Sequence, residues 1–224
     1  MHDYPEVPDT DKIPHELLAK ALTEAANYPH QNKPYWIQVI GIPGSGKTTF
    51  VEMLSKRLEF RRPYTLASND TFMDQIPEYQ AMADRALAFQ TFEGPARALV
   101  FELFKKLIAQ KNDVLYEHST SYPPVRDLMY YIKQSGFTFV LVRITVPLDV
   151  AKRRAHQREA ETNRHIPESV IDERAALGDS RWEELSQIAD YKISVENDGS
   201  LPPNETFSET ITKITDFVKS LELN

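Results

Sequence analysis

Short apolar runs alternate along this chain with longer stretches in which apolar residues recur at every third or fourth position. The runs predict β-strands and the spaced stretches predict α-helices, because side chains repeat every two residues in a strand and about every 3.6 in a helix. The run at 137–146 is almost wholly apolar, which is typical of a strand covered on both faces of a parallel sheet. The predicted strands are 36–40, 64–67, 113–116, 137–146 and 191–195.

Helical spacing fills most of the sequence between the predicted strands. Because strands and helices alternate, we predict an α/β fold with a mostly parallel five-stranded sheet, helices on both faces and right-handed crossovers. The predicted helices are 14–28, 49–58, 78–88, 91–110, 127–134, 148–161, 167–177 and 208–221.

The N-terminal part of the chain differs from the rest. Residues 1–13 are polar and contain two prolines, so we expect them to form a loose arm. We therefore divide the chain into an arm with its helix, residues 1–34, and a main domain, residues 35–224.

Composition narrows the functions open to the chain. The formal net charge of −7 over 224 residues argues against non-specific binding to nucleic acid or to anionic membranes. The absence of cysteine excludes a disulfide framework and thiolate chemistry. No apolar stretch reaches the roughly 18 residues that a membrane span needs. We expect a cytoplasmic protein with no membrane partner, and nucleic acid is a disfavoured partner.

The segment 41–48, G-I-P-G-S-G-K-T, lies between the first predicted strand and a predicted helix. It fits G-x-x-x-x-G-K-[ST], the phosphate-binding P-loop, in which glycines let successive N–H groups point at one phosphate. Lys47 is expected to reach the β- and γ-phosphates, and the hydroxyl of Thr48 to hold Mg²⁺. The predicted nucleotide-binding residues are Gly41, Ile42, Pro43, Gly44, Ser45, Gly46, Lys47, Thr48 and Thr49.

A P-loop by itself is compatible with a switch GTPase, a motor ATPase or a small-molecule kinase. A GTPase usually carries N-K-x-D for guanine, but the segment 32–35, N-K-P-Y, lacks the aspartate. A motor ATPase usually has an apolar strand that ends in acids, and 114–117 is only a loose version of it. The kinase interpretation needs a carboxylate near the γ-phosphate, arginines to neutralise the transferring phosphoryl group, and a lid that excludes water.

Asp70 is the candidate carboxylate, because it follows the second predicted strand and so lies at the same sheet edge as the P-loop. An ionised aspartate there can orient a hydroxyl and accept its proton. The alternative is that Asn69 or Asp70 only caps the next helical turn.

Four arginines, Arg153, Arg154, Arg158 and Arg164, form the candidate lid. Arg154 and Arg158 are four residues apart and share a helix face. The alternatives are a solvated basic face and a nucleic-acid patch.

Glu117 directly follows the third predicted strand. It is a candidate to bind substrate hydroxyls or to act on Mg²⁺ through water. The alternative is an ordinary surface acid at the end of a strand.

Together these segments resemble the zeta-toxin family of P-loop kinases. The resemblance rests on the P-loop at 41–49, the N-D-T-F segment at 69–72 and the Q-I-P-E-Y segment at 75–79. Weaker similarities lie in the strand and polar residues at 114–119, the strand–proline–helix segment at 146–150 with its following arginines, and the segments 163–168 and 193–197.

The resemblance implies a mechanism and a P-loop kinase fold. ATP or GTP would bind the P-loop with Mg²⁺ at Thr48, Asp70 would deprotonate a hydroxyl, and Lys47, Arg158 and Arg164 would stabilise the transferring phosphoryl group. The implied substrate-binding residues are Asp70, Glu117, Ser119 and Thr120.

The resemblance also implies a substrate class and a partner. Family members of known activity phosphorylate UDP-activated amino sugars, and in some of them an antitoxin protein blocks the nucleotide site. The chain departs from the family after Glu117, where the family often has glycine–threonine and then an arginine. Two further functions remain open: a kinase of a nucleoside, an antibiotic or a nucleic-acid end, and a nucleotide-binding regulatory protein without phosphotransfer.

Overall fold

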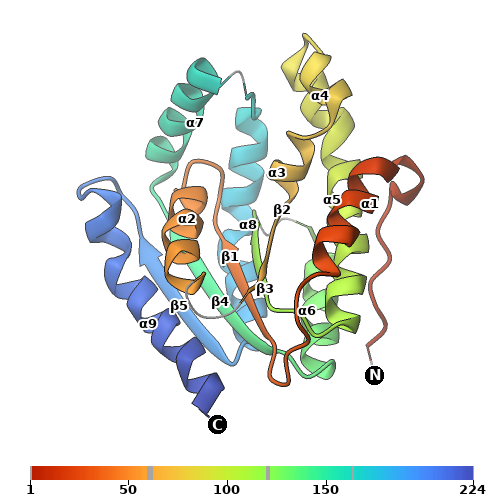
Figure 1. The fold of residues 1–224 in the computed structure, drawn as a ribbon. Helices are drawn as coiled ribbons and strands as arrows, with labels where there is room; N and C mark the ends of the chain where they lie inside the picture. The colour runs from red at the N-terminus through yellow and green to blue at the C-terminus, as the bar shows by residue number, and fades with distance from the viewer. Residues whose placement is uncertain (1, 60–62, 120–121, 163, 224) are drawn as a thin grey trace.

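The computed structural model describes residues 2–59, 63–119, 122–162 and 164–223. Its centre is a five-stranded parallel sheet in the order β2-β3-β1-β4-β5 (Figure 1). The predicted α/β fold with a parallel sheet is therefore confirmed. The strands are β1 (Tyr35–Ile40), β2 (Thr65–Ser68), β3 (Val114–His118), β4 (Thr138–Thr145) and β5 (Tyr191–Glu196).

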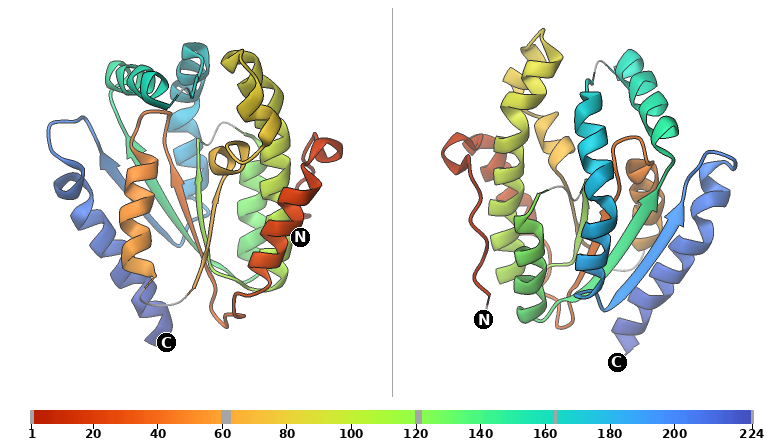
Figure 2. Two further views of the ribbon diagram at one scale, coloured as in Figure 1. Left: turned by 45° about the horizontal axis from the view of Figure 1, so that its top comes forward. Right: turned by 180° about the vertical axis from the view of Figure 1, so that it is seen from behind.

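Helices cover both faces of the sheet, as the two turned views in Figure 2 show. The helices are α1 (His15–Ala25), α2 (Lys47–Leu58), α3 (Asn69–Met73), α4 (Pro77–Ala81), α5 (Arg85–Ala109), α6 (Pro124–Gln134), α7 (Leu148–Thr162), α8 (Glu168–Ser186) and α9 (Pro203–Leu223), with a short 3₁₀ helix at Thr10–Lys12.

The central strand β1 is buried along its whole length because its side chains alternate between two cores. Trp36 and Ile40 face α5 and α6, where Trp36 packs against Phe104 with ring centroids 4.6 Å apart. Ile37 and Val39 face α2 and α9 on the other side. The register pairs Ile40 with His118 of β3, so the strands end together at one edge of the sheet.

Two predictions about the helices are wrong. The expected break between 88 and 91 does not occur, and α5 runs unbroken from Arg85 to Ala109 with Pro95 inside it. The break lies earlier instead, where the carboxylate of Asp84 accepts a hydrogen bond from Leu87 N at 3.0 Å and caps the helix. Helix α8 also continues past the expected end at 177, through Gly178 to Ser186.

The expectation of a loose N-terminal arm is also wrong. The hydroxyl of Tyr4 donates to the carbonyl of Phe101 at 2.5 Å, and the Tyr4 ring packs edge-on against Tyr131. Val7 joins the same core. Aromatic packing in a polar segment therefore holds the arm against α5 and α6, while the division of the chain at residue 34 stays a prediction.

Candidate active site

The P-loop joins β1 to α2 at the carboxyl edge of the sheet, and its glycines are required by geometry. Gly44 and Gly46 have φ angles of 81° and 93°, which side chains rarely adopt. A Cβ atom at Gly44 would lie 2.3 Å from the carbonyl oxygen of Ala151, and one at Gly46 would lie 2.4 Å from Nδ2 of Asn197. The loop is therefore packed tightly against α7 and against the end of β5.

Side chains from two other elements hold the loop in place. Asn197 Nδ2 donates to the carbonyl of Ser45 at 2.8 Å. Arg154 Nη1 donates to the carbonyl of Asn197 at 3.1 Å and to that of Gly44 at 3.4 Å. The predicted lid residue Arg154 is thus bonded to the nucleotide loop in this structure.

A cavity of about 340 Å³ opens beside the P-loop. It is lined by residues of the loop, of α3, of the end of β3 and of the helices α5, α7 and α8. The lining residues are Pro43, Gly44, Gly46, Lys47, Thr48, Thr49, Asn69, Asp70, Glu93, Glu117, His118, Ser119, Arg154, Ala155, Arg158, Arg164, Ile166 and Arg174.

Most of the predicted site residues thus meet in one place. Gly41, Ile42 and Ser45 belong to the loop without lining the cavity. Thr120 lies outside the described residues, so its predicted role has no structural account.

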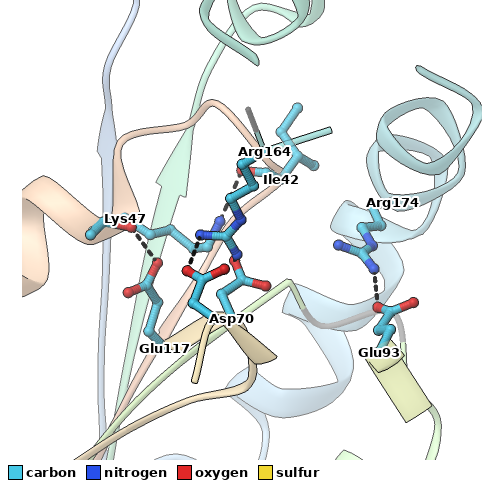
Figure 3. A network of polar contacts seen from close by, with 9 residues as sticks. Ile42, Lys47, Asp70, Glu93, Glu117, Arg164 and Arg174 are labelled. Atoms are coloured by element: carbon cyan, nitrogen blue, oxygen red, sulfur yellow. Dashed lines mark hydrogen bonds and ion pairs between the residues drawn. The ribbon is translucent and has the colours of Figure 1, made fainter. Parts of the chain in front are cut away.

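Lys47 and Thr48 begin α2 and line the cavity. Figure 3 shows Lys47 beside Glu117 and Asp70. Lys47 Nζ donates to the carbonyl of Ile42 at 3.0 Å. Burial lowers the pKa of Lys47, and the neighbouring carboxylates Glu117 and Asp70 oppose that shift. The hydroxyl of Thr48 donates to Oε1 of Glu117 at 2.9 Å.

Glu117 is buried, so the alternative of a surface acid at the strand end is wrong. Burial raises the pKa of this carboxyl, while Lys47 counteracts the rise. Its position places the carboxylate beside the Thr48 hydroxyl, the group expected to hold Mg²⁺. The two oxygen donors are of the kind that Mg²⁺ prefers, and they suit an ion that keeps several of its waters.

Asp70 lies inside α3, whose N-cap is Ser68 and makes no side-chain capping bond, so the capping alternative is wrong. Asp70 Oδ2 forms an ion pair with Arg164 Nη2 at 2.7 Å (Figure 3). Burial acts to raise the pKa of the Asp70 carboxyl, but Arg164 and the other cations of the cavity outweigh it and hold the pKa below its ordinary value. The side chain is 42 % exposed and lines the cavity, so it can reach a bound molecule.

The candidate lid arginines separate into two groups. Arg154, Arg158 and Arg164 line the cavity, and Arg164 is only 7 % exposed. Arg153 points outward and is exposed, 3.9 Å from Asp149. The alternative of a solvated basic face therefore holds for Arg153 alone among the four.

Sequence reasoning missed an arginine–glutamate pair on the far wall of the cavity. Arg174 of α8 is buried and bonds to Glu93 of α5 (Figure 3). Glu93 also pairs with Arg97 at 3.1 Å. Both residues lie in predicted helices of mixed charge, and no local motif marks them.

His118, which sequence reasoning left unassigned, also lines the cavity. Its ring stacks on Tyr116 with centroids 4.3 Å apart. Burial, followed by the charge of Lys47, lowers the pKa of His118 to about 3, so the ring is neutral at physiological pH.

The sequence profile of the family described as Zeta toxin matches residues 19–201. The chain therefore belongs to the zeta-toxin family. A search of curated proteins found no match.

Solved structures share the fold. A structure from a study of the PezAT chromosomal toxin–antitoxin system of Streptococcus pneumoniae aligns with a TM-score of 0.63 and 15 % identity over 99 % of this chain and 100 % of that one. Shikimate kinase from Acinetobacter baumannii in complex with shikimate aligns with a TM-score of 0.53 and 18 % identity over 86 % and 97 %. The AvrRxo1-ORF1:-ORF2 structure with ATP aligns at 0.62 and 15 % identity over 95 % and 79 %. Family membership and the kinase-like fold together support nucleotide-dependent phosphotransfer.

Proposed function

We propose that this member of the zeta-toxin family transfers the γ-phosphoryl group of ATP or GTP to a hydroxyl of a small metabolite. One observation carries the proposal: Lys47 of the P-loop, the carboxylate of Asp70 and the guanidinium of Arg164 line the same cavity. A triphosphate site with a base and a neutralising cation beside it is the arrangement that phosphoryl transfer requires.

Each group has a distinct part in the reaction. The P-loop amides and Lys47 hold the β- and γ-phosphates. Asp70, ionised at neutral pH because its pKa is lowered, orients the acceptor hydroxyl and takes its proton as the new O–P bond forms. The bond between the γ-phosphorus and the β–γ bridging oxygen breaks in the same step, and ADP or GDP leaves. Arg158 and Arg164 stabilise the negative charge on the transferring group, and their side chains help to exclude water.

Mg²⁺ would be held by the hydroxyl of Thr48, with Glu117 bound directly or through water. The hydrogen bond between these two side chains shows that both face one point beside Lys47. When bound, the ion neutralises phosphate charge and orients the phosphates for transfer.

The acceptor is proposed to be a sugar-like, polyhydroxylated molecule, and a UDP-activated amino sugar is the specific candidate. Among the described residues that line the cavity none is Phe, Tyr or Trp, so no stacking slot for a nucleobase is formed by them. Carboxylates and an amide, from Asn69, Glu93 and Glu117, line it instead. These groups suit the hydroxyls of the sugar part of such an acceptor, and a uracil base would have to bind outside these lining residues.

An antitoxin-like protein is the proposed macromolecular partner. One structure of the same fold comes from a study of a toxin–antitoxin system. The resemblance to the zeta-toxin family implies an antitoxin that blocks the nucleotide site. We propose that such a partner would cover the cavity entrance and so compete with ATP.

The decisive experiment measures transfer of label from γ-labelled ATP into a cell metabolite extract. We expect one labelled product with the wild type, and a loss of about a thousandfold in Asp70→Ala with ATP binding retained. Asp172→Ala is the matched control, because Asp172 pairs with Lys152 outside the cavity.

Near wild-type transfer by Asp70→Ala would refute the assignment of the base. ATP binding by the wild type without any labelled product would favour the regulatory alternative. A labelled nucleoside or nucleic-acid end would favour the other kinase alternative.

A further inference from the structure

Arg164 is shared by two carboxylates that lie one helical turn apart. Its Nη2 atom is 2.7 Å from Oδ2 of Asp70, and its Nη1 atom donates to Oδ2 of Asp74 at 3.3 Å. Asp74 is the C-cap of α3, and its backbone N–H donates to the carbonyl of Asp70 at 3.0 Å. One short helix therefore fixes the spacing of the two acids that hold the guanidinium.

The contact with Asp70 conflicts with the proposed reaction. Asp70 must turn its oxygen to a substrate hydroxyl, and Arg164 must turn its charge to the phosphoryl group. Each therefore has to give up part of the 2.7 Å ion pair. Arg164 is only 7 % exposed. If Asp70 were its one acidic partner, the guanidinium would become a buried, uncompensated charge whenever that ion pair opened.

We infer that Asp74 is a positioning residue that retains Arg164 over the cavity after Asp70 exchanges its ion pair for the substrate hydroxyl. The inference rests on the proposed function. Asp74 engages Nη1, which leaves the Nη2 edge of the planar guanidinium available to turn from Asp70 to the phosphoryl group. Asp74 does not line the cavity, so it acts through Arg164 and not on the substrate.

The first test separates positioning from nucleotide binding. We expect Asp74→Asn to lower kcat by about ten- to a hundredfold, because a misplaced catalytic group costs a factor of that order, while KM for ATP stays within about twofold. Asp74→Glu, which keeps the carboxylate, is expected to recover at least part of kcat. Asp172→Asn is the matched control: it removes the acid paired with Lys152 on the neighbouring helices, and we expect wild-type kinetics.

A rise in KM for ATP equal to the fall in kcat would overturn the inference, since Asp74 would then support the ground-state nucleotide site. Wild-type kcat in Asp74→Asn would also overturn it. Circular dichroism and thermal melting of each variant show whether a loss comes from unfolding.

The second test does not depend on activity. The side-chain nitrogens of Arg164 are followed by ¹⁵N NMR, with Arg164→Lys used to assign its signal. In Asp70→Asn we expect the signal of a guanidinium held rigidly by Asp74, and in Asp70→Asn/Asp74→Asn we expect a freely rotating one. A freely rotating guanidinium in Asp70→Asn alone would overturn the inference.

The two tests also separate this inference from the proposed function. If the wild type transfers no phosphoryl group, the proposed function fails. The positioning of Arg164 by Asp74 is then judged by the NMR signals alone. If transfer is found and Asp74→Asn is unaffected, the proposed function stands and the inference fails.

Discussion

The two walls of the cavity are built in different ways. The wall on the nucleotide side is mostly backbone: the P-loop curls through Gly44 and Gly46, and Asn197 donates to one of its carbonyls. The opposite wall is made of charged side chains, such as Asp70 of α3 and Arg164 of the segment between α7 and α8, that come from separate parts of the chain and hold one another through ion pairs.

The difference follows from what each wall is proposed to bind. Phosphate groups are the same in every nucleotide, so a rigid set of backbone N–H groups recognises them without any choice of side chain. The acceptor differs between kinases, and side chains on separate helices can change one at a time. Substitutions in the backbone wall are therefore expected to act through steric clashes. Substitutions in the charged wall are expected to act by removing a partner from an ion pair.

The largest effect is expected when the backbone wall is broken at Gly46. Gly46→Ala places a Cβ atom 2.4 Å from Asn197 Nδ2 on a backbone with φ of 93°. We expect ATP affinity to fall by at least about a hundredfold, because the loop amides must shift and the oriented donors are lost. Isothermal titration with ATP in the presence of Mg²⁺ measures the affinity.

Gly136→Ala is the matched control, since its φ is 81° but its Cβ atom meets nothing closer than Lys111 Nζ at 3.8 Å. We expect it to lose about 1–2 kcal/mol of folding free energy and to keep ATP affinity. Equal affinity loss in both variants would show that strain, and not the collision with Asn197, decides the result.

A smaller effect is expected at the side chain that supports the backbone wall. Arg154→Ala removes the hydrogen bonds to the carbonyls of Asn197 and Gly44, and we expect ATP affinity to fall by about tenfold, the value of one or two such bonds. Arg153→Ala, at the exposed neighbouring position, is expected to leave the affinity unchanged. If Arg154→Ala kept its ATP affinity and lost kcat, the result would instead support the predicted role of Arg154 in the lid.

The last effect is on the free energy of unfolding and not on ATP binding, and it concerns protonation of His118. His118 has a pKa of about 3 in the folded chain against 6.5 for the free side chain, so the unfolded state binds a proton first as the pH falls. The contribution of His118 to the free energy of unfolding is therefore lost as the pH falls from 6.5 toward 3. The loss is about 1.4 kcal/mol per pH unit in this window.

Urea unfolding at pH 7.5 and 5.5 measures this dependence. We expect His118→Phe, which can keep the stacking on Tyr116, to lose part of the acid dependence. His15→Phe, at an exposed position, serves as the control and is expected to keep it. The same slope in wild type and His118→Phe would contradict a neutral, buried His118.

Much of the fold was predictable because its signals are local. The apolar runs mark the strands, and all five occur within a few residues of their expected places. The helix boundary near Asp84 was missed because a capping aspartate competes with a continuous helical pattern on both sides of it. The packed arm was missed because Tyr4 is a single aromatic residue in a polar segment.

No helix within the described ranges is long and apolar enough to cross a membrane. The compartment of the protein remains a prediction from composition.

What the sequence determined by itself is the nucleotide side of the cavity and the sheet edge on which Asp70 lies. A P-loop is a contiguous motif, and parallel strands bring their carboxyl ends to one edge. Only the tertiary structure decided which charges face each other. Arg174 and Glu93 come from different helices, and Arg164 reaches Asp70 and Asp74 across 90 residues or more of sequence. Such pairs depend on how helices rotate and pack, which no local pattern specifies.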